Sequence, residues 1–412
     1  MNVKWYRDTT LIEEQNYVVD KPDYFCDTQV QAYNKIVITI NNMTKANRFL
    51  KIFNMSDGIT RQFYNDEIEN LEIIEEITTN NQALNINECQ LTILPKNNTG
   101  VLFQRTLPFS VYRNNNLFGK FYVDTSTSNT NKTLYKLKVS DEIKLLEAQQ
   151  YLGGIYNNIT VSSLVADILG SDIEYELDSS LANLTISGYL PILNKREALR
   201  EVAFIINAYV DTSRDNKLVI KPFSSTCDRT LTDAEIISIS TTQKNIVTQI
   251  NVNTSLLTTT NAERDEIFNG VVNGNEYIVF DSPKFNLTIT GGTIVNSNCN
   301  YAIISGNGSN VVLSGKSYEI YVNKKEKLNN YVVSTDIANV QEYETSLICN
   351  EINIINNLHF VEYYLKVVFK MGETKVGDNI CLDDMTCRVC QLSYSLQQTE
   401  IYAEAELEAY YE

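Results

Sequence analysis

Histidine is nearly absent from this sequence of 412 residues, which contains only His359. The shortage excludes metal sites built from histidine pairs and leaves one imidazole that could activate a serine or cysteine nucleophile. His359 itself lies in an apolar, β-prone run at residues 358–361. A histidine in such a run more often packs in the core or at a strand edge than takes part in chemistry, so we expect no functional role for it.

Basic side chains are also few. Lys and Arg number 34 against 51 Asp and Glu, which gives a net charge of −17 and a pI near 4.7. Because phosphate binding requires a dense Lys/Arg surface, sequence-specific binding of nucleic acid is not expected. The N-terminus lacks the apolar core of a signal peptide, and no segment approaches the roughly 20 apolar residues of a membrane span. We therefore expect a protein that makes no membrane contact and stays soluble in the cytoplasm.

Eight cysteines in a chain of this length are too sparse for a disulfide scaffold, so reduced thiols are expected. The spacing of Cys387 and Cys390 resembles a zinc or redox motif, but a structural zinc site needs four ligands and only Cys381 is near. Residues 386–394 also have the composition of a strand, where residues three apart point to opposite faces. We expect neither zinc binding nor redox chemistry.

Cofactor motifs are missing as well. There is no phosphate-binding loop and no dinucleotide-binding glycine fingerprint, and Gly153 and Gly154 follow a predicted helix, where they fit a helix C-cap. The sequence has one Trp, unlike the aromatic-lined clefts that usually hold sugars, although carboxylates such as Glu72 and Glu75 leave a glycosidase open on residue type alone. No catalytic, cofactor-binding or metal-binding residue is assigned.

Short β-prone runs dominate both ends of the sequence. Before residue 141 they are separated by Asn, Gly, Ser and Pro clusters, a pattern typical of a barrel or sandwich; they are residues 36–40, 91–94, 109–112, 119–123 and 133–139. After residue 223 strands return at residues 246–252, 277–280 and 365–369. Residues 257–346 are rich in Asn, Gly, Ser and Thr; strand-like runs at 311–313 and 318–322 favour a small β domain over a flexible loop.

Helical periodicity is confined to the middle of the chain. Helices are predicted at residues 141–150, at 161–169 with Gly170 as the C-terminal cap, and at 195–208. Asn194 and Glu197 form a capping box at the start of the third helix. A turn at residues 188–191 precedes this helix, and a hairpin follows it at residues 209–220, joined by a polar connection with turn chemistry at 212–216.

The last strand has the clearest alternation in the sequence. Ala403, Ala405 and Leu407 fall on one face, and Glu404 and Glu406 fall on the other. Like charges on one strand face repel each other, so this acidic face must meet water or a cationic partner.

Together these segments resemble the baseplate hub proteins of phage tails and phage-tail-like bacteriocins, the tail hub or late control protein D family. The segments that carry the resemblance are residues 119–123, 135–137, 141–146, 153–156, 161–170, 173–175, 188–191, 196–204 and 401–407. Two departures stand out: Asn207 occupies a position where the family pattern has glycine, and residues 257–346 match no family segment.

The resemblance implies a mainly β fold with an α+β central domain. Two tail-tube-like β-barrel or sandwich domains, residues 1–140 and 223–412, would flank a small α+β domain at 141–222, with an inserted β-rich region at about 257–346. A homotrimer of this kind would act as a symmetry adaptor, a ring that joins the sixfold tail tube to the threefold central spike.

The same resemblance implies a structural protein without enzymatic activity or cofactor. Its partners would be the tail tube protein, the spike protein, the tape-measure protein and other baseplate proteins. It would assemble in the bacterial cytoplasm and end in the tail baseplate of the released particle. Since the sequence ends after the hub-like last strand, a separate spike protein is expected, which favours a contractile tail or a bacteriocin.

Interface candidates lie in the middle domain and on the last strand. They are Gly188, Tyr189, Pro191, Arg196, Arg200, Glu404, Glu406 and Glu408. We expect the three glutamates to line the channel of the trimer.

The alternative function is a tail-associated cell-wall hydrolase or carbohydrate-binding β protein of the same particles. Whether the parent particle is a phage or a bacteriocin is left open.

Overall fold

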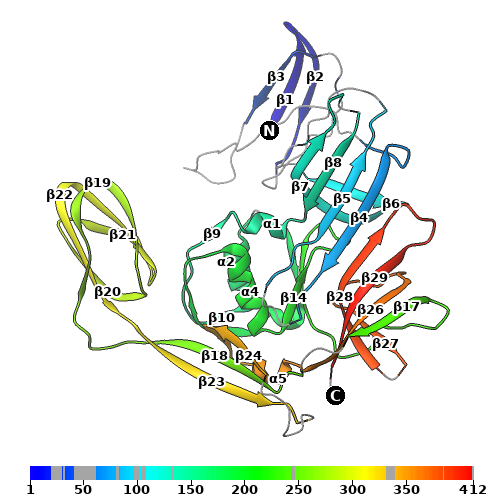
Figure 1. Cartoon of the computed structure of the whole chain (residues 1–412). Coiled ribbons are helices and arrows are strands. Elements are labelled where there is room, and N and C mark those ends of the chain that lie inside the picture. Colours follow the sequence, from blue (N-terminus) through cyan, green and yellow to red (C-terminus); the bar gives the residue numbers. More distant parts are fainter. Residues whose placement is uncertain are drawn as a thin grey trace. The chain divides into compact units, whose positions relative to one another are not determined.

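The computed structural model describes residues 1–19, 30, 33–40, 62–79, 83–96, 103, 108–131, 133–171, 173–242, 246–330, 339–383 and 385–410. The chain divides into two compact units, Met1–Tyr64 with Gly170–Ile173 and Asn65–Leu169 with Glu174–Glu412. The fold is mainly β, as predicted (Figure 1). The predicted domain boundaries remain a prediction.

A three-stranded antiparallel sheet forms the core of the N-terminal unit. Its strands, in the order β2-β1-β3, are β1 (Asn2–Arg7), β2 (Thr10–Asn16) and β3 (Lys35–Thr39). Val3 and Trp5 on the central strand are buried. The only Trp of the sequence is therefore a core residue of this small sheet.

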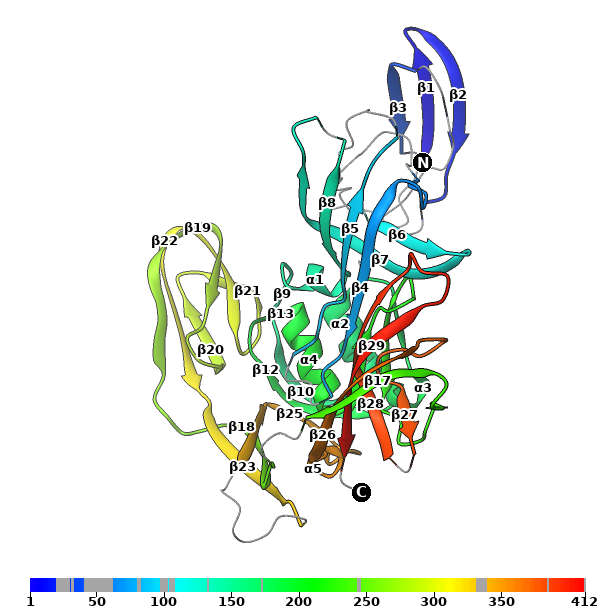
Figure 2. The same ribbon diagram turned by 45° about the vertical axis from the view of Figure 1, so that its right-hand side comes forward.

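An eleven-stranded sheet dominates the second unit and combines strands from both halves of the sequence (Figures 1 and 2). The first half supplies β4 (Ile68–Glu76), β5 (Glu88–Ile93), β6 (Phe109–Arg113), β7 (Asn116–Ser128) and β8 (Tyr135–Ser140). The second half supplies β16 (Arg229–Thr230), β17 (Ile236–Thr242), β26 (Val361–Lys370), β27 (Asn379–Leu382), β28 (Met385–Ser395) and β29 (Tyr402–Tyr410). The main order is β17-β26-β29-β28-β4-β5-β8-β7-β6.

The two halves join where β28 pairs antiparallel with β4, with Tyr394 opposite Ile73 and Gln391 opposite Glu76. Ile73, Leu392 and Tyr394 are buried at this seam. The strands predicted on either side of the middle segment thus share one hydrogen-bonded sheet.

The middle segment is an α+β arrangement. Its helices are α1 (Ile143–Leu146), α2 (Val161–Leu169), α3 (Ser179–Ala182) and α4 (Lys195–Ile205), and α5 (Ile354–Asn357) follows later in the chain. Its strands are β9 (Gln150–Tyr151), β10 (Gly154–Thr160), β11 (Tyr175–Leu177), β12 (Thr185–Leu190), β13 (Leu193–Asn194), β14 (Ala208–Asp211) and β15 (Leu218–Pro222). The later strand β25 (Leu347–Cys349) pairs with β12.

Two of the predicted helices are shorter than expected. The helix predicted at residues 141–150 is only α1, because the chain enters β9 at Gln150. The helix predicted at 195–208 ends at Ile205, since Asn207 adopts a φ of +52° and β14 begins at Ala208. Asparagine tolerates the left-handed backbone better than most residues, which explains how it replaces glycine here.

Other local predictions are confirmed. The helix α2 has the predicted bounds, and Gly170 after it has a φ of +70°. The Asn194 side chain accepts a hydrogen bond from the Glu197 backbone N–H at 2.8 Å, as an N-cap does. The hairpin of β14 and β15 is also present.

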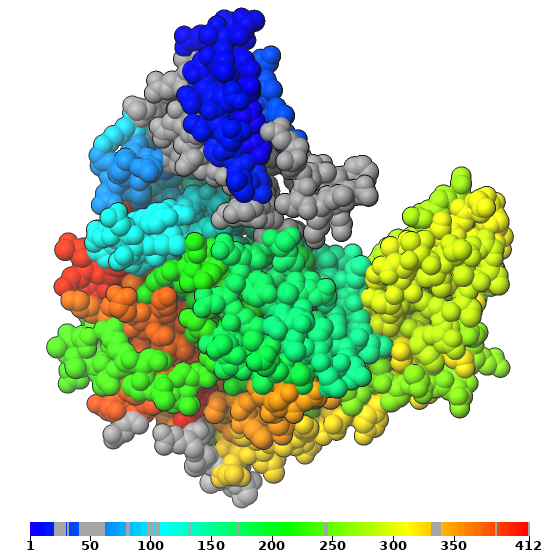
Figure 3. Space-filling view, turned by 180° about the vertical axis from the view of Figure 1, so that it is seen from behind, coloured from blue at the N-terminus to red at the C-terminus, as the bar shows by residue number. Residues whose placement is uncertain are grey.

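Strands are also present in the described part of residues 257–346, where a small β domain was favoured over a loop. A three-stranded sheet consists of β18 (Gln249–Thr258), β23 (Glu319–Leu328) and β24 (Val340–Thr345). A second sheet, here called the inserted sheet, consists of β19 (Asp265–Val279), β20 (Lys284–Thr290), β21 (Thr293–Ser297) and β22 (Tyr301–Ser317). The inserted sheet has its own apolar core, which includes Val272, Ile304 and Leu313. Figure 3 shows these yellow-green strands as a lobe with a broad surface.

Candidate functional site

Gly188 stands at a close approach between two strands. It has a φ of +132°, and a Cβ at this position would lie 2.3 Å from the Ser346 carbonyl oxygen. Only glycine fits such an approach. A turn was predicted at residues 188–191. Residues 188–190 instead belong to β12, which continues to Leu190. The glycine serves the contact with the neighbouring segment and not a chain reversal.

Tyr189 contacts the inserted sheet. Its hydroxyl donates a hydrogen bond to Oδ1 of Asn300 at 2.8 Å. Asn300 donates from Nδ2 to the Leu190 carbonyl, and Asn298 donates to the Gly153 carbonyl, both at 2.9 Å. Side-chain amides from the connection between β21 and β22 therefore fasten the inserted sheet to the middle segment.

Gly153 does not cap a helix, contrary to the sequence prediction. The helix α1 ends at Leu146, and β9 separates it from Gly153. Gly153 has a φ of +61°, and a Cβ there would lie 2.2 Å from the Leu190 carbonyl oxygen and 2.4 Å from that of Pro191. The glycine is required because two backbone segments meet at this point.

The two predicted arginines on α4 bind within this chain. Arg196 donates from Nε to the Leu84 carbonyl at 2.7 Å and forms an ion pair with Glu147. Arg200 pairs with Glu201 on the same helix. Arg196 thereby connects α4 to the segment between β4 and β5. A role for either arginine between subunits remains a prediction.

The glutamates of β29 lie on the polar face of the eleven-stranded sheet. Glu404 and Glu406 are exposed, while the alternating residues Ala403, Ala405 and Leu407 are buried, as the sequence pattern predicted. Glu404 forms an ion pair with Lys366 on β26. Glu408 is half-buried and accepts hydrogen bonds from Thr79 and Tyr410 at 2.6 and 2.8 Å.

Negative charge accumulates on this face. Burial raises the pKa of Glu76, and the nearby charges of Glu406 and Glu88 raise it further. These three carboxylates come from three different strands, β4, β29 and β5. Glu76 and Glu406 together therefore favour a cation or water over another anion, whereas Glu88 and Glu404 already form ion pairs with Lys138 and Lys366.

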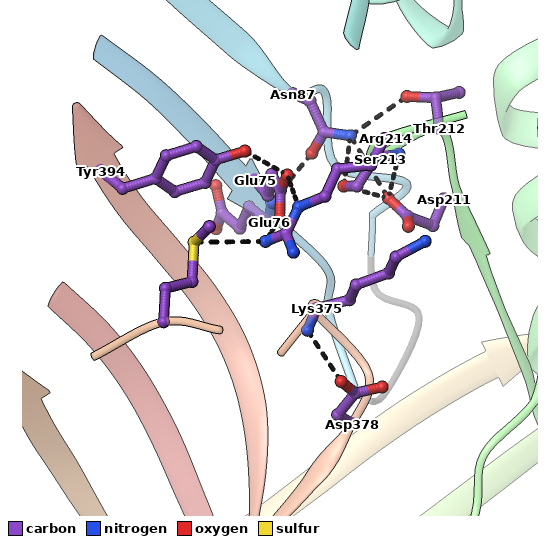
Figure 4. Close-up of polar contacts among 11 residues, drawn as sticks. Glu75, Glu76, Asn87, Asp211, Thr212, Ser213, Arg214, Lys375, Asp378 and Tyr394 are labelled. Atoms are coloured by element: carbon purple, nitrogen blue, oxygen red, sulfur yellow. Dashed lines mark hydrogen bonds and ion pairs between the residues drawn. The ribbon is translucent and has the colours of Figure 1, made fainter. Parts of the chain in front are cut away.

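A buried ion pair lies where the two halves of the large sheet meet (Figure 4). Arg214 donates from Nε and Nη2 to the two carboxylate oxygens of Glu75 at 3.0 Å each, and the Tyr394 hydroxyl donates to Glu75 at 2.5 Å. The guanidinium also lies 5.5 Å from the Tyr394 ring centre and 5.9 Å from that of Phe118. Burial alone would lower the pKa of Arg214, but the charge of Glu75 raises it, so the arginine stays charged.

A second set of buried polar groups adjoins this pair. Asn87 Nδ2 lies 3.3, 3.1 and 3.2 Å from side-chain oxygens of Asp211, Thr212 and Ser213, and Asp141 accepts from the Asn87 N–H at 3.0 Å and from the Thr212 hydroxyl at 2.6 Å. Burial raises the pKa of Asp141 to about 7, although these hydrogen bonds oppose the shift.

These two sets, here called the polar junction, adjoin at Ser213 and Arg214 and bring together five segments of the sequence. The segments are β4, the residues before β5, the residues after β8, the end of β14 with its connection to β15, and β28. Buried polar groups satisfied in this way fix the relative register of the elements that carry them. We therefore assign the polar junction a structural role.

The sequence interpretation missed the polar junction. It treated residues 212–216 as a polar connection with turn chemistry, yet Thr212 and Ser213 are buried and Arg214 has a φ of +55°. The only signal in the sequence was Arg214 inside a predicted turn. An arginine in a turn is usually exposed to solvent, so its position did not indicate a buried ion pair. The partners that bury it are distant in the chain.

Cys227 and Cys381 form a disulfide, so the expectation of reduced thiols is wrong for this pair. The cause is tertiary: β16 runs parallel to β27, and the two Cα atoms lie 5.9 Å apart, within the normal range for a disulfide. The free thiols in the described part of the chain are Cys89, Cys299, Cys349, Cys387 and Cys390; Cys26 lies outside it.

The pair Cys387 and Cys390 lies on β28, as predicted for a strand. Burial raises the pKa of Cys387 to about 11 and that of Cys390 well above its usual value. Within the described ranges no three His, Cys, Asp or Glu side chains form a group suited to a metal ion. His359 packs beside Tyr410, with ring centres 5.2 Å apart, and burial lowers its pKa.

Among the described helices, none has the length and apolar character needed to cross a membrane.

No protein-family model matches the sequence, and no match was found among curated proteins. Solved structures to which this chain is similar include tail proteins of prophages and bacteria. The prophage tail protein gp18 from Listeria monocytogenes EGD-e has a TM-score of 0.46 at 11% identity, covering 82% of this chain and 94% of that one. The tail protein from Neisseria meningitidis MC58 has a TM-score of 0.49 at 11% identity, covering 83% and 92%. The 43 kDa tail protein of prophage MuSo2 from Shewanella oneidensis has a TM-score of 0.45 at 10% identity, covering 82% and 98%.

Proposed function

We propose that this chain is the structural baseplate hub of a phage or phage-tail-like particle. In this proposal a homotrimeric ring joins the sixfold tail tube to the threefold central spike. Its partners are the tail tube, spike, tape-measure and other baseplate proteins, and it assembles in the bacterial cytoplasm. The proposal starts from the family resemblance of the ordered sequence segments. The observation that carries it furthest is the form of the eleven-stranded sheet.

The large sheet has the two faces that a channel wall needs. Along β29 every second side chain is buried in the core, and the alternating glutamates Glu404 and Glu406 are exposed. Glu76 on β4 adds negative charge beside Glu406, whereas Glu404 and Glu88 form ion pairs with Lys366 and Lys138. A wall of this kind repels DNA while water fills the channel, so a nucleic acid could pass without binding.

The two ends of the sheet support contacts between copies. In the described part of the chain, β17 at one end and β6 at the other each pair with a single strand. Ile237 and Ile239 on β17 are 63% and 50% exposed, and Tyr112 on β6 is 62% exposed. Exposed strand edges with apolar side chains invite pairing with another chain. Pairing β17 of one copy with β6 of the next is a head-to-tail contact that can close into a ring.

The oligomeric state tests this proposal directly. Light scattering of the purified protein should give the mass of a trimer, and Ile239→Lys should shift it toward monomer because a lysine charge would then lie beside the side chains of the paired strand. The matched control is Ile320→Lys, which changes an isoleucine of 59% exposure on β23 and should leave the trimer intact. Equal effects of both variants would count against pairing through β17.

Electron microscopy of purified particles tests the location. Antibody labelling should place the protein as a ring between tube and spike, whereas its absence from particles would reject the hub proposal. The hydrolase alternative predicts clearing in a zymogram on purified cell wall, and the hub proposal predicts none.

A further inference from the structure

One face of the inserted sheet packs in its core, and the opposite face is exposed. Core residues such as Val272, Ala302 and Ile304 point to one side. The alternating residues of β19, which point to the other side, are exposed; they are Val271, Asn273, Asn275, Tyr277 and Val279. This set, with its neighbours on β22 and β21, is here called the outer face.

The outer face is nearly without charge in a protein of net charge −17. From Phe285 to Gly315, a stretch that contains all of β21 and most of β20 and β22, the sequence has no Asp, Glu, Lys or Arg. On β19 the residues between Val271 and Val279 include one charge, Glu276, which falls among the core-side positions of the alternation. Such a face has no charged side chains that could attract a polyanion or a basic peptide. Its partner is therefore neutral.

Tyr277 provides a fixed aromatic surface on the outer face. It is 43% exposed and lies 5.3 Å, ring centre to ring centre, from Tyr301, which is 6% exposed. Asn296 on β21 donates from Nδ2 to the Tyr301 hydroxyl at 3.2 Å. Tyr301 is thus held from a neighbouring strand and supports the exposed ring of Tyr277 from one side.

Unused amides lie next to this ring. Among the described residues the side chains of Asn273 and Asn275 have no hydrogen-bond partner, whereas Asn269 on the same strand is bound by Asn310. Gly274 between them has a φ of +90° with nothing within 4 Å of where a Cβ would project. Glycine inside a strand often marks a place where a ligand approaches the backbone.

From these contacts we propose that the outer face binds a neutral oligosaccharide. The apolar face of a sugar ring packs on an aromatic ring, and sugar hydroxyls both donate to and accept from amides. Residues two apart on a strand are roughly 7 Å apart, so a sugar on Tyr277 brings the next unit of a chain to Asn275. A cell-surface glycan has this chemistry. The inference is independent of the hub proposal, since a hub without it would still join tube and spike.

The test uses the full-length protein and an array of neutral bacterial surface oligosaccharides, with polygalacturonate as an anionic comparison. Binding to one or more neutral glycans is expected. Tyr277→Ala should weaken it by roughly tenfold, the loss of one aromatic contact, while Tyr277→Phe should retain it. Tyr321→Ala is the matched control, because Tyr321 is an exposed tyrosine on β23 and its loss should change nothing.

A variant that keeps the shape of the face gives a second measurement. Asn275→Asp replaces an amide by a carboxylate of the same size and should also weaken binding, without loss of thermal stability. Three results of the glycan assay would overturn the proposal: no binding to any neutral glycan, equal binding to polygalacturonate, or binding that both substitutions leave unchanged. Self-association of the protein that Tyr277→Ala abolishes would also overturn it, because the occupant would then be a second copy.

Discussion

Arg214 and Glu75, 139 residues apart in the sequence, form a bidentate ion pair in the interior of the protein. The arginine comes from the connection between β14 and β15, and the glutamate comes from β4. Tyr394 on β28 completes the contact. The pair therefore joins the middle segment to both halves of the large sheet.

Removing one partner of this pair should be strongly destabilising. Arg214→Met leaves the Glu75 carboxylate buried without its counter-charge, and we expect a loss of about 3–5 kcal/mol in the free energy of unfolding. Removing both charges with Glu75→Leu and Arg214→Met should cost less than the sum of the single changes. Urea denaturation of the two single variants and the double variant measures this coupling. Additive losses would mean that the two side chains do not stabilise each other.

A side chain at position 188 should disturb the contact between β12 and the segment before β25. Gly188→Ala places a Cβ against the Ser346 carbonyl oxygen, so we expect a loss of at least about 1–3 kcal/mol. Gly274→Ala is the control, because Gly274 also has a positive φ but has open space around it. Thermal unfolding should show a clearly larger loss for Gly188→Ala. Similar losses would show that backbone conformation alone, and not the close approach, determines the effect.

Stability should decrease as the pH rises from about 4 to about 7. Burial raises the pKa of Asp141 from 3.8 to about 7 and that of Glu142 from 4.5 to about 7. In this window the folded protein keeps protons that the unfolded chain releases, so each carboxyl contributes stability at low pH that is lost as the pH passes its folded pKa. Denaturation at a series of pH values measures the slope.

Asp141→Asn should flatten this pH dependence, by an amount on the order of 1 kcal/mol between pH 5 and pH 7. Asp233→Asn, a change at an exposed aspartate, should leave the slope as it is. An unchanged slope in Asp141→Asn would contradict the buried environment that raises the pKa.

The disulfide should stabilise the segment that precedes β17. It closes a long loop between Cys227 and Cys381, which are 154 residues apart, so we expect a loss of about 2–4 kcal/mol on reduction or in Cys227→Ser. Peptide mapping without reductant should recover the two cysteines in one linked species. Cys349→Ser, at a free thiol, should leave that species intact.

Local features of the fold could be predicted from the sequence because their causes are local. The apolar spacing of α2 and the cap residues of α4 lie within a few residues of the structure that they determine. The alternation on β29 likewise reports one buried face. In each case the neighbouring residues carry the whole signal.

The predictions that failed concern residues whose partners are distant in the sequence. The turn expected at Gly188 and the cap expected at Gly153 are local explanations for glycines that other strands require. The predictions for Arg214 and for the cysteine pair failed for the same reason. The partners of Arg214, and of Cys227 and Cys381, lie far away in the sequence. No pattern within a few residues distinguishes these roles from ordinary turn, cap or surface positions.

The pairing of β4 with β28 has a consequence for how the chain reaches its native state. The edge of β4 is exposed until Met385–Ser395 has left the ribosome, since only that late segment completes the hydrogen bonds of this strand. Contacts between such distant segments slow folding, and unpaired edges promote aggregation in the meantime. Production of this protein should therefore depend on chaperones and on low temperature more than its final stability suggests.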